Sequence, residues 1–99
     1  MKFGDFCEVG RLIAERIRDP FAASYDYNSF SSWHISVIAG RRPVRLVWDG
    51  RDGWLVIQTA QTVHSPGRDS YDWQDHWIGK DASEQTPEAA LAQVELLRT

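Results

Sequence analysis

Cysteine is nearly absent from this 99-residue chain: Cys7 is alone, so no intramolecular disulfide can form. The fold must be stable through packing, and we expect a reducing compartment, the cytoplasm. Because Cys7 lies in an apolar segment, we predict a small core side chain there rather than a reactive thiol. No Gly-x-Ser-x-Gly motif surrounds a serine, so the sequence gives no support for nucleophilic catalysis.

Long apolar runs and an excess of basic residues are also missing. No run approaches the roughly 20 apolar residues that span a bilayer, and Met1 to Asp5 holds no apolar signal core. We therefore expect no membrane association. The net charge of -3 and a pI near 5.5 disfavour nonspecific binding to nucleic acids or anionic membranes, which usually requires a basic surface. A partner with a basic surface suits the chain better.

What the chain does contain is typical of one soluble globular domain, residues 1–99. Hydrophobic residues make up 42% and charged residues 25%, while five tryptophans exceed the average for this length. A domain of this size has a modest core and little room for a buried active site of several residues. We assign no catalytic residue, no metal ligand and no cofactor.

The two ends of the chain have helical patterns. Asp5 followed by Glu8 resembles a capping box, and Asp19-Pro20 predicts the end of this first helix. Thr86-Pro87-Glu88 predicts the start of a second helix, with Thr as cap and Pro at the first helical position. The apolar residues at helical spacing are Phe6, Val9, Leu12, Ile13 and Ile17 in the first helix, and Ala90, Leu91, Val94 and Leu97 in the second.

The middle of the chain has strand patterns. Apolar residues alternate with polar ones in residues 33–39 and 44–48, and residues 54–57 form a third, wholly apolar strand after a tight turn at Asp49 to Gly53. Residues 21–32 read as a loop with a short edge strand around Ala22 to Tyr27. The sequence therefore predicts an α+β fold: an antiparallel meander of three to four strands, with both terminal helices on one face (α-β-β-β-α order).

The pairing of the last hairpin decides which side chains face outward. If Trp48 lies opposite Leu55, then Trp54 and Val56 face away from the core; if Trp48 lies opposite Trp54, then Leu55 and Ile57 do. Both registers leave an apolar outer face, which requires a cover. A later segment of the chain, a second copy in a homodimer or another protein could provide it.

Double-stranded RNA-binding domains share the order of helix, three strands and helix. Such domains need lysines at the start of the last helix to contact phosphates, whereas this helix opens with Glu84-Gln85-Thr86-Pro87-Glu88. The main basic concentration is Arg41, Arg42 and Arg45, which a solvated turn also explains. Nucleic-acid binding through these arginines stays an alternative hypothesis.

Residues 64–77 gather histidines and aspartates, the side chains of metal sites and acid-base catalysis. This pattern supports an alternative hypothesis of a small metal-dependent or acid-base enzyme that uses His64, Asp72, Asp75 and His76. However, no H-E-x-x-H motif and no paired cysteine accompanies them.

The same segment interleaves aromatic residues with acids. Tryptophan and tyrosine provide large rigid contact areas and dominate the binding energy of protein interfaces, and carboxylates steer basic partners. We therefore hypothesise a small acidic, noncatalytic protein-binding module. Small acidic bacterial proteins of this size commonly act as inhibitors, such as immunity proteins that neutralise toxins, or as chaperones. The expected partner-binding residues are Asp69, Tyr71, Asp72, Trp73, Asp75 and Trp77.

Overall fold

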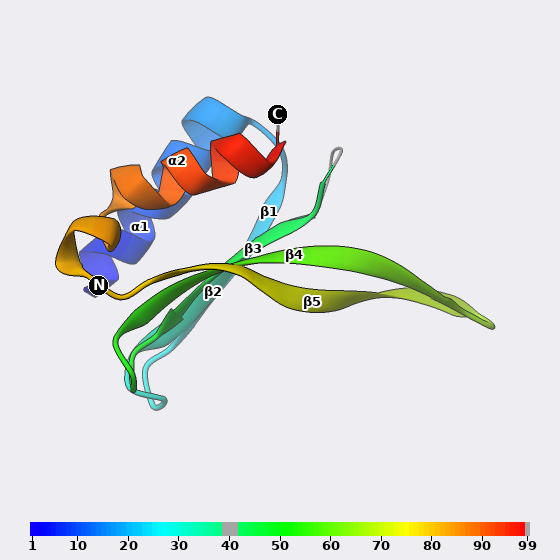
Figure 1. The fold of residues 1–99 in the computed structure, drawn as a ribbon, viewed down its shortest axis with the longest axis horizontal. Helices are drawn as coiled ribbons and strands as arrows, with labels where there is room; N and C mark the ends of the chain where they lie inside the picture. Colours follow the sequence, from blue (N-terminus) through cyan, green and yellow to red (C-terminus); the bar gives the residue numbers. More distant parts are fainter. Residues whose placement is uncertain (39–41, 99) are drawn as a thin grey trace.

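The computed structural model describes residues 1–38 and 42–98. The chain forms a sheet of five strands, and the two terminal helices lie over one face of it, as Figure 1 shows. The elements are α1 (Phe3–Leu12), a π-helical turn η1 (Ile13–Ile17), β1 (Phe21–Asp26), β2 (Ser32–Val37), β3 (Val44–Asp49), β4 (Trp54–Ser65), β5 (Arg68–Gly79), a 3-10 turn η2 (Ala82–Glu84) and α2 (Pro87–Arg98).

The sheet is an antiparallel meander in the order β1-β2-β3-β4-β5, with each strand beside its neighbour in sequence. The predicted α+β class and antiparallel sheet are confirmed. The predicted three to four strands are too few, because β5 occupies a segment that reads as irregular. Its side chains are exposed on both sides over most of its length, so no alternation of buried and polar residues reveals it.

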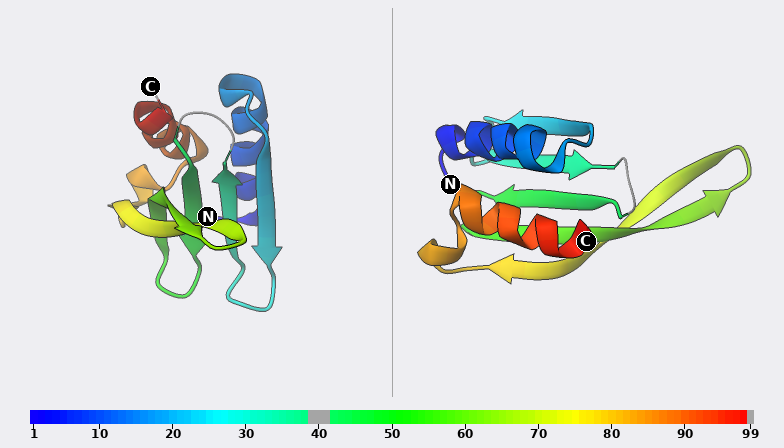
Figure 2. Two further views of the ribbon diagram at one scale, coloured as in Figure 1. Left: turned by 90° about the vertical axis from the view of Figure 1, so that its right-hand side faces the viewer. Right: turned by 90° about the horizontal axis from the view of Figure 1, so that it is seen from above.

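The core lies between the two helices and one face of the sheet, which we call the inner face (Figure 2). Alternate residues of β2, β3 and β4 point into it, because successive side chains of a strand face opposite sides. The helices close it with their apolar stripes. The buried residues are Val9, Leu12, Ile13, Trp33, Ile35, Val37, Val44, Leu46, Trp48, Leu55, Ile57, Ala90, Leu91, Val94 and Leu97.

The N-cap of the first helix is Lys2, three residues before the predicted cap, Asp5. The Lys2 backbone N–H donates to the Asp5 carboxylate at 2.7 Å, so Asp5 lies in the first turn and is not the cap. The helix ends at Arg18, which has φ of 66°, directly before Asp19-Pro20. Cys7 is exposed, so its prediction as a core residue is wrong: it lies on the solvent face of α1.

The C-terminal helix begins as predicted. Thr86 Oγ1 accepts a hydrogen bond from the Ala89 N–H at 3.2 Å, which caps the first turn. At the other end, the largely buried Arg98 side chain pairs with Asp19 and donates to the Arg42 carbonyl. This contact joins α2 to the segment between α1 and β1. No described helix is long and apolar enough to cross a membrane.

The register of β3 against β4 is the first of the two predicted pairings. Trp48 lies opposite Leu55 and Leu46 opposite Ile57, with all four on the inner face. Trp54 therefore faces outward, as that pairing requires.

The turn between β3 and β4 lies directly against the turn between β1 and β2. The Gly50 N–H donates to Ser32 Oγ at 2.9 Å, and a Cβ at Gly50 would overlap the carbonyl oxygen of Phe30. Glycine is needed at position 50 because any side chain would push two main chains apart.

Beyond the body of the sheet, β4 and β5 continue as a two-stranded arm, residues 60–73, and the pair of Gln58 and Asp75 lies at its base. The pairing of β3 with β4 ends at Val44 and Thr59, whereas β4 and β5 stay paired as far as Ser65 and Arg68. The arm extends away from the helices on the right of Figure 1 and gives the molecule its longest dimension of 41 Å. Residues 61–72 are all exposed, so this part of the chain contributes nothing to the core.

Candidate functional site

The outer face of the sheet is the side opposite the helices. It is apolar in part, as both registers predict: Val47, Trp54 and Val56 are partly buried, and Ile78 is exposed. Lys80 lies over the Trp54 ring, with its ammonium 4.3 Å from the ring centroid. Among the described elements, both helices lie on the opposite side, so the outer face is open to a partner.

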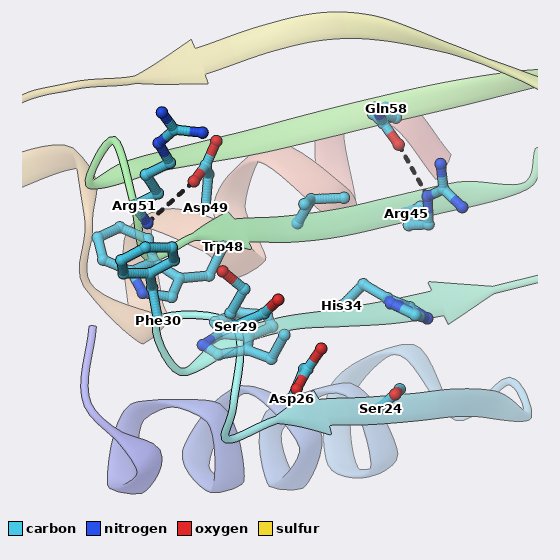
Figure 3. Close-up of a pocket in the computed structure, with 13 residues that line it drawn as sticks. Ser24, Asp26, Ser29, Phe30, His34, Arg45, Trp48, Asp49, Arg51 and Gln58 are labelled. Atoms are coloured by element: carbon cyan, nitrogen blue, oxygen red, sulfur yellow. Dashed lines mark hydrogen bonds between the residues drawn. The ribbon is translucent and has the colours of Figure 1, made fainter.

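A depression of about 630 Å³ lies on this face, over β1, β2, β3 and the start of β4. Figure 3 shows Phe30 and Trp48 at one end, and Arg45 with His34 at the other. The two carboxylates that line it accept hydrogen bonds from nearby backbone N–H groups. Asp26 accepts from the Asn28 N–H at 3.0 Å, and Asp49 accepts from the Arg51 N–H at 3.0 Å. These carboxylates stabilise turns.

Arg45 lies at one end of the depression and contacts two residues of neighbouring strands. Its Nε donates to Gln58 Oε1 at 2.7 Å, and its guanidinium carbon lies 4.6 Å from the centroid of the Trp73 ring. Gln58 in turn donates from Nε2 to Asp75 Oδ1 at 2.8 Å. Burial lowers the pKa of Arg45, and the Asp75 charge opposes that shift. This network connects the depression to the base of the arm.

His34 shares this end of the depression. Burial, followed by the positive charge of Arg45, lowers the pKa of His34 below its ordinary value of 6.5. Ser24 on β1 lies directly opposite His34. Cationic and hydroxyl donors therefore gather at this end.

The expected partner-binding residues all lie on β5, but the strand divides them between its two sides. Asp69, Tyr71, Trp73 and Asp75 point to the side continuous with the outer face. The rings of Tyr71 and Trp73 lie 5.8 Å apart, at an interplanar angle of 45°. Asp72 points to the opposite side, because strand residues alternate.

Trp77 is separated from Trp73 by a β-bulge. Ile57 pairs with Trp77 but Gln58 pairs with Asp75, so His76 is an extra residue on β5. The bulge reverses the alternation, and Trp77 packs against the core while Trp73 faces outward. Sequence spacing alone places both tryptophans on the same side of a regular strand.

The four residues of the enzyme hypothesis lie apart. His64 is near the tip of the arm, where its Nδ1 lies 3.0 Å from Asp69 Oδ1, whereas Asp75 is at the base and bonds to Gln58. Asp72 points to the other side of β5 from Asp75. Within residues 1–38 and 42–98, no three His, Cys, Asp or Glu side chains come together as ligands for a metal ion.

The three arginines of the nucleic-acid hypothesis do not form one described patch. Arg41 lies outside the described residues. Arg42 is exposed beside the C-terminal helix, and its carbonyl accepts from Arg98, whereas Arg45 belongs to the outer face of β3. Arg45 therefore contacts Gln58 and Trp73 and does not form a common basic patch with Arg42.

Sequence analysis missed the network of Arg45, Gln58 and Asp75. Part of the signal was present, because the register that pairs Trp48 with Leu55 also pairs Arg45 with Gln58. Asp75 could not be placed there without knowledge of the bulge. Scans against protein-family models, curated proteins and solved structures found no match to this chain.

Proposed function

We propose that this protein is a noncatalytic module that binds a basic surface of another protein, through the side of the arm that carries Tyr71 and Trp73. One observation carries the proposal: an aromatic pair lies between the carboxylates of Asp69 and Asp75, on an arm that buries nothing of the core. Tyr71 is 39% exposed and is available for contact.

The arm is unusual as a free-standing element. A two-stranded ribbon is at best marginally stable alone in water, and residues 61–72 have no packing layer on either side. Contact with a partner would supply the missing layer. The retention of twelve exposed residues that the core does not use favours a role in binding rather than in folding.

Charge favours a basic partner. Strand β5 carries three aspartates and one arginine: Asp69, Asp72, Asp75 and Arg68. Carboxylates around an aromatic anchor speed the encounter with a cationic surface and leave the affinity to the rings. A small protein that covers a basic surface in this way acts as a neutralising partner, of the immunity type, or as a chaperone.

The same charges disfavour a homodimer through the free edge of β5. An antiparallel two-fold pairing centred on Asp72 would place Asp69 of one copy opposite Asp75 of the other, and like charges across a strand pair are destabilising. Aspartates and a bulge on an edge strand also discourage edge-to-edge association.

The test compares three immobilised proteins in capture from the native host: the natural chain, Trp73→Ala and Tyr27→Ala. Tyr27 is a matched control, because it is 80% exposed and lies in the turn between β1 and β2, at the opposite end of the sheet from the arm. We expect a partner with a basic surface to be retained by the natural chain and Tyr27→Ala. Loss of a central aromatic costs about 2 kcal/mol, so Trp73→Ala should bind roughly 30-fold more weakly.

The same experiment is repeated at several ionic strengths. The association rate should fall as ionic strength rises, because screening weakens the attraction between carboxylates and cations. Equal capture by Trp73→Ala and Tyr27→Ala would contradict the proposed surface. Capture of an acidic partner with a salt-independent association rate would contradict the proposed partner class.

A further inference from the structure

The guanidinium of Arg45 is held in one orientation before any ligand arrives. Its Nε donates to Gln58 Oε1, and its guanidinium carbon lies over the Trp73 ring, so two contacts restrict the group. Gln58 is itself held by Asp75. A guanidinium whose freedom has already been restricted loses little entropy when it binds a ligand.

The remaining donors of this guanidinium have no acceptor among the residues that the structure describes. Among residues 1–38 and 42–98, the Arg45 side chain makes one hydrogen bond, from Nε to Gln58, and it takes part in no ion pair. Asp75 makes no hydrogen bond or ion pair with it and bonds to Gln58 instead, so its charge acts on Arg45 only from a distance. A partly buried cation without a contacting anion is costly, and two Nη groups form a fork that matches the oxygens of a carboxylate or a phosphate.

The neighbours of Arg45 add donors rather than acceptors. His34 on β2 becomes a second cation when protonated, and Ser24 on β1 provides a hydroxyl opposite it. The nearby acids are Asp75, which is bonded to Gln58, and Asp26, which caps the turn after β1. The unmet requirement at this end of the depression is therefore an acceptor with negative charge.

We propose that the Arg45 end of the depression binds an oxyanion, the carboxylate or phosphate group of a small molecule. The Nη groups of Arg45 bind two of its oxygens, and His34 and Ser24 supply further donors. The depression of about 630 Å³ lies within the range of small-molecule sites and leaves room for the rest of the ligand along β2 and β3 toward Phe30. This site does not depend on the proposed protein partner.

The test follows the His34 ring and the Arg45 Nε resonances of the intact protein by NMR, at constant ionic strength balanced with chloride. Sulfate, which stays doubly charged through the titration, represents a phosphate group, and acetate at pH 7 represents a carboxylate. We expect saturable binding of one or both at millimolar concentration, and the stronger of the two identifies the source of the oxyanion. Bound sulfate should raise the pKa of His34, because a nearby anion stabilises the imidazolium.

Three variants separate a formed site from diffuse attraction. Arg45→Gln should weaken binding at least tenfold, and Arg45→Lys, which keeps the charge but not the fork, should weaken it several-fold. Arg51→Gln is the matched control, because Arg51 lies at the other end of the same depression; there we expect less than a twofold change. A well-dispersed spectrum verifies that each variant is folded.

Equal weakening by Arg45→Gln and Arg51→Gln would overturn the proposal, as would His34 and Arg45 resonances of the natural chain that neither sulfate nor acetate shifts in a saturable way. The His34 measurement needs no substitution, so a variant that fails to fold does not remove the test. Failure here leaves the partner-binding surface of Tyr71 and Trp73 standing, since Tyr27→Ala and Trp73→Ala test that surface separately.

Discussion

Replacing Gly50 with alanine tests the contact between the two turns at one end of the sheet. The new Cβ would overlap the Phe30 carbonyl oxygen and lie 2.9 Å from the Phe30 carbonyl carbon. Both atoms belong to the main chain, so no side-chain rotation relieves the overlap and one turn must move. That movement also breaks the hydrogen bond from the Gly50 N–H to Ser32 Oγ.

The expected cost combines two terms. Overpacking against main chain costs about 2 kcal/mol, and loss of one hydrogen bond adds about 1 kcal/mol. A loss of about 3 kcal/mol in the free energy of unfolding corresponds to a fall of roughly 12–24 °C in Tm for a domain of this size. Thermal and urea denaturation followed by tryptophan fluorescence measure both quantities.

Gly4→Ala is the matched control. Position 4 lies in the first turn of α1, and a Cβ there meets nothing within 4 Å. We expect a small gain of about 0.5 kcal/mol, because alanine loses less conformational entropy than glycine in a helix. If Gly50→Ala unfolds within 0.5 kcal/mol of the natural chain, the packing of the two turns described here is wrong.

Three further perturbations test other parts of the molecule. Asp19→Ala removes a carboxylate that pairs with the largely buried Arg98 and should lower the free energy of unfolding by about 2 kcal/mol. Glu88→Ala removes an exposed ion pair and should cost less than about 1 kcal/mol in urea denaturation. Because the pKa of His34 is lowered in the folded protein, the unfolded state binds more protons below about pH 6.5. The free energy of unfolding therefore decreases as the pH is lowered through this range. His34→Gln should therefore reduce the loss of stability between pH 7 and pH 5, and an unchanged pH profile would argue against the partial desolvation of this side chain. Replacing residues 61–72 with Asn-Gly should change the free energy of unfolding by less than about 1 kcal/mol, since all twelve residues are exposed; a larger loss would show that the arm supports the core.

The parts of the fold that the sequence predicted are those with one buried side. The alternation of apolar residues in β2 and β3 predicts both the strands and which of their side chains face the core. Thr86 predicts where α2 begins. These signals work because burial forces a periodic pattern on the chain. The edge strand β1 is exposed along nearly all of its length and was predicted only as a short segment.

The candidate site was predictable only in part. The aromatic and acidic composition of residues 64–77 predicts a binding segment, and this prediction stays untested. Which residues act together depended on the bulge at His76, for which the sequence has no signal. Arg45 was interpreted as part of a basic turn, because its role comes from Gln58 and Trp73 on other strands.

The bulge has a consequence for how such a protein can diverge. A single inserted or deleted residue near His76 would exchange the two sides of β5 beyond that point and present Asp72 and Gln74 where Tyr71 and Trp73 now stand. The apolar core would keep its packing, because residues 61–72 are exposed and lie outside it. A change of one residue in length would thus replace an aromatic surface of the arm with a polar one in a single step.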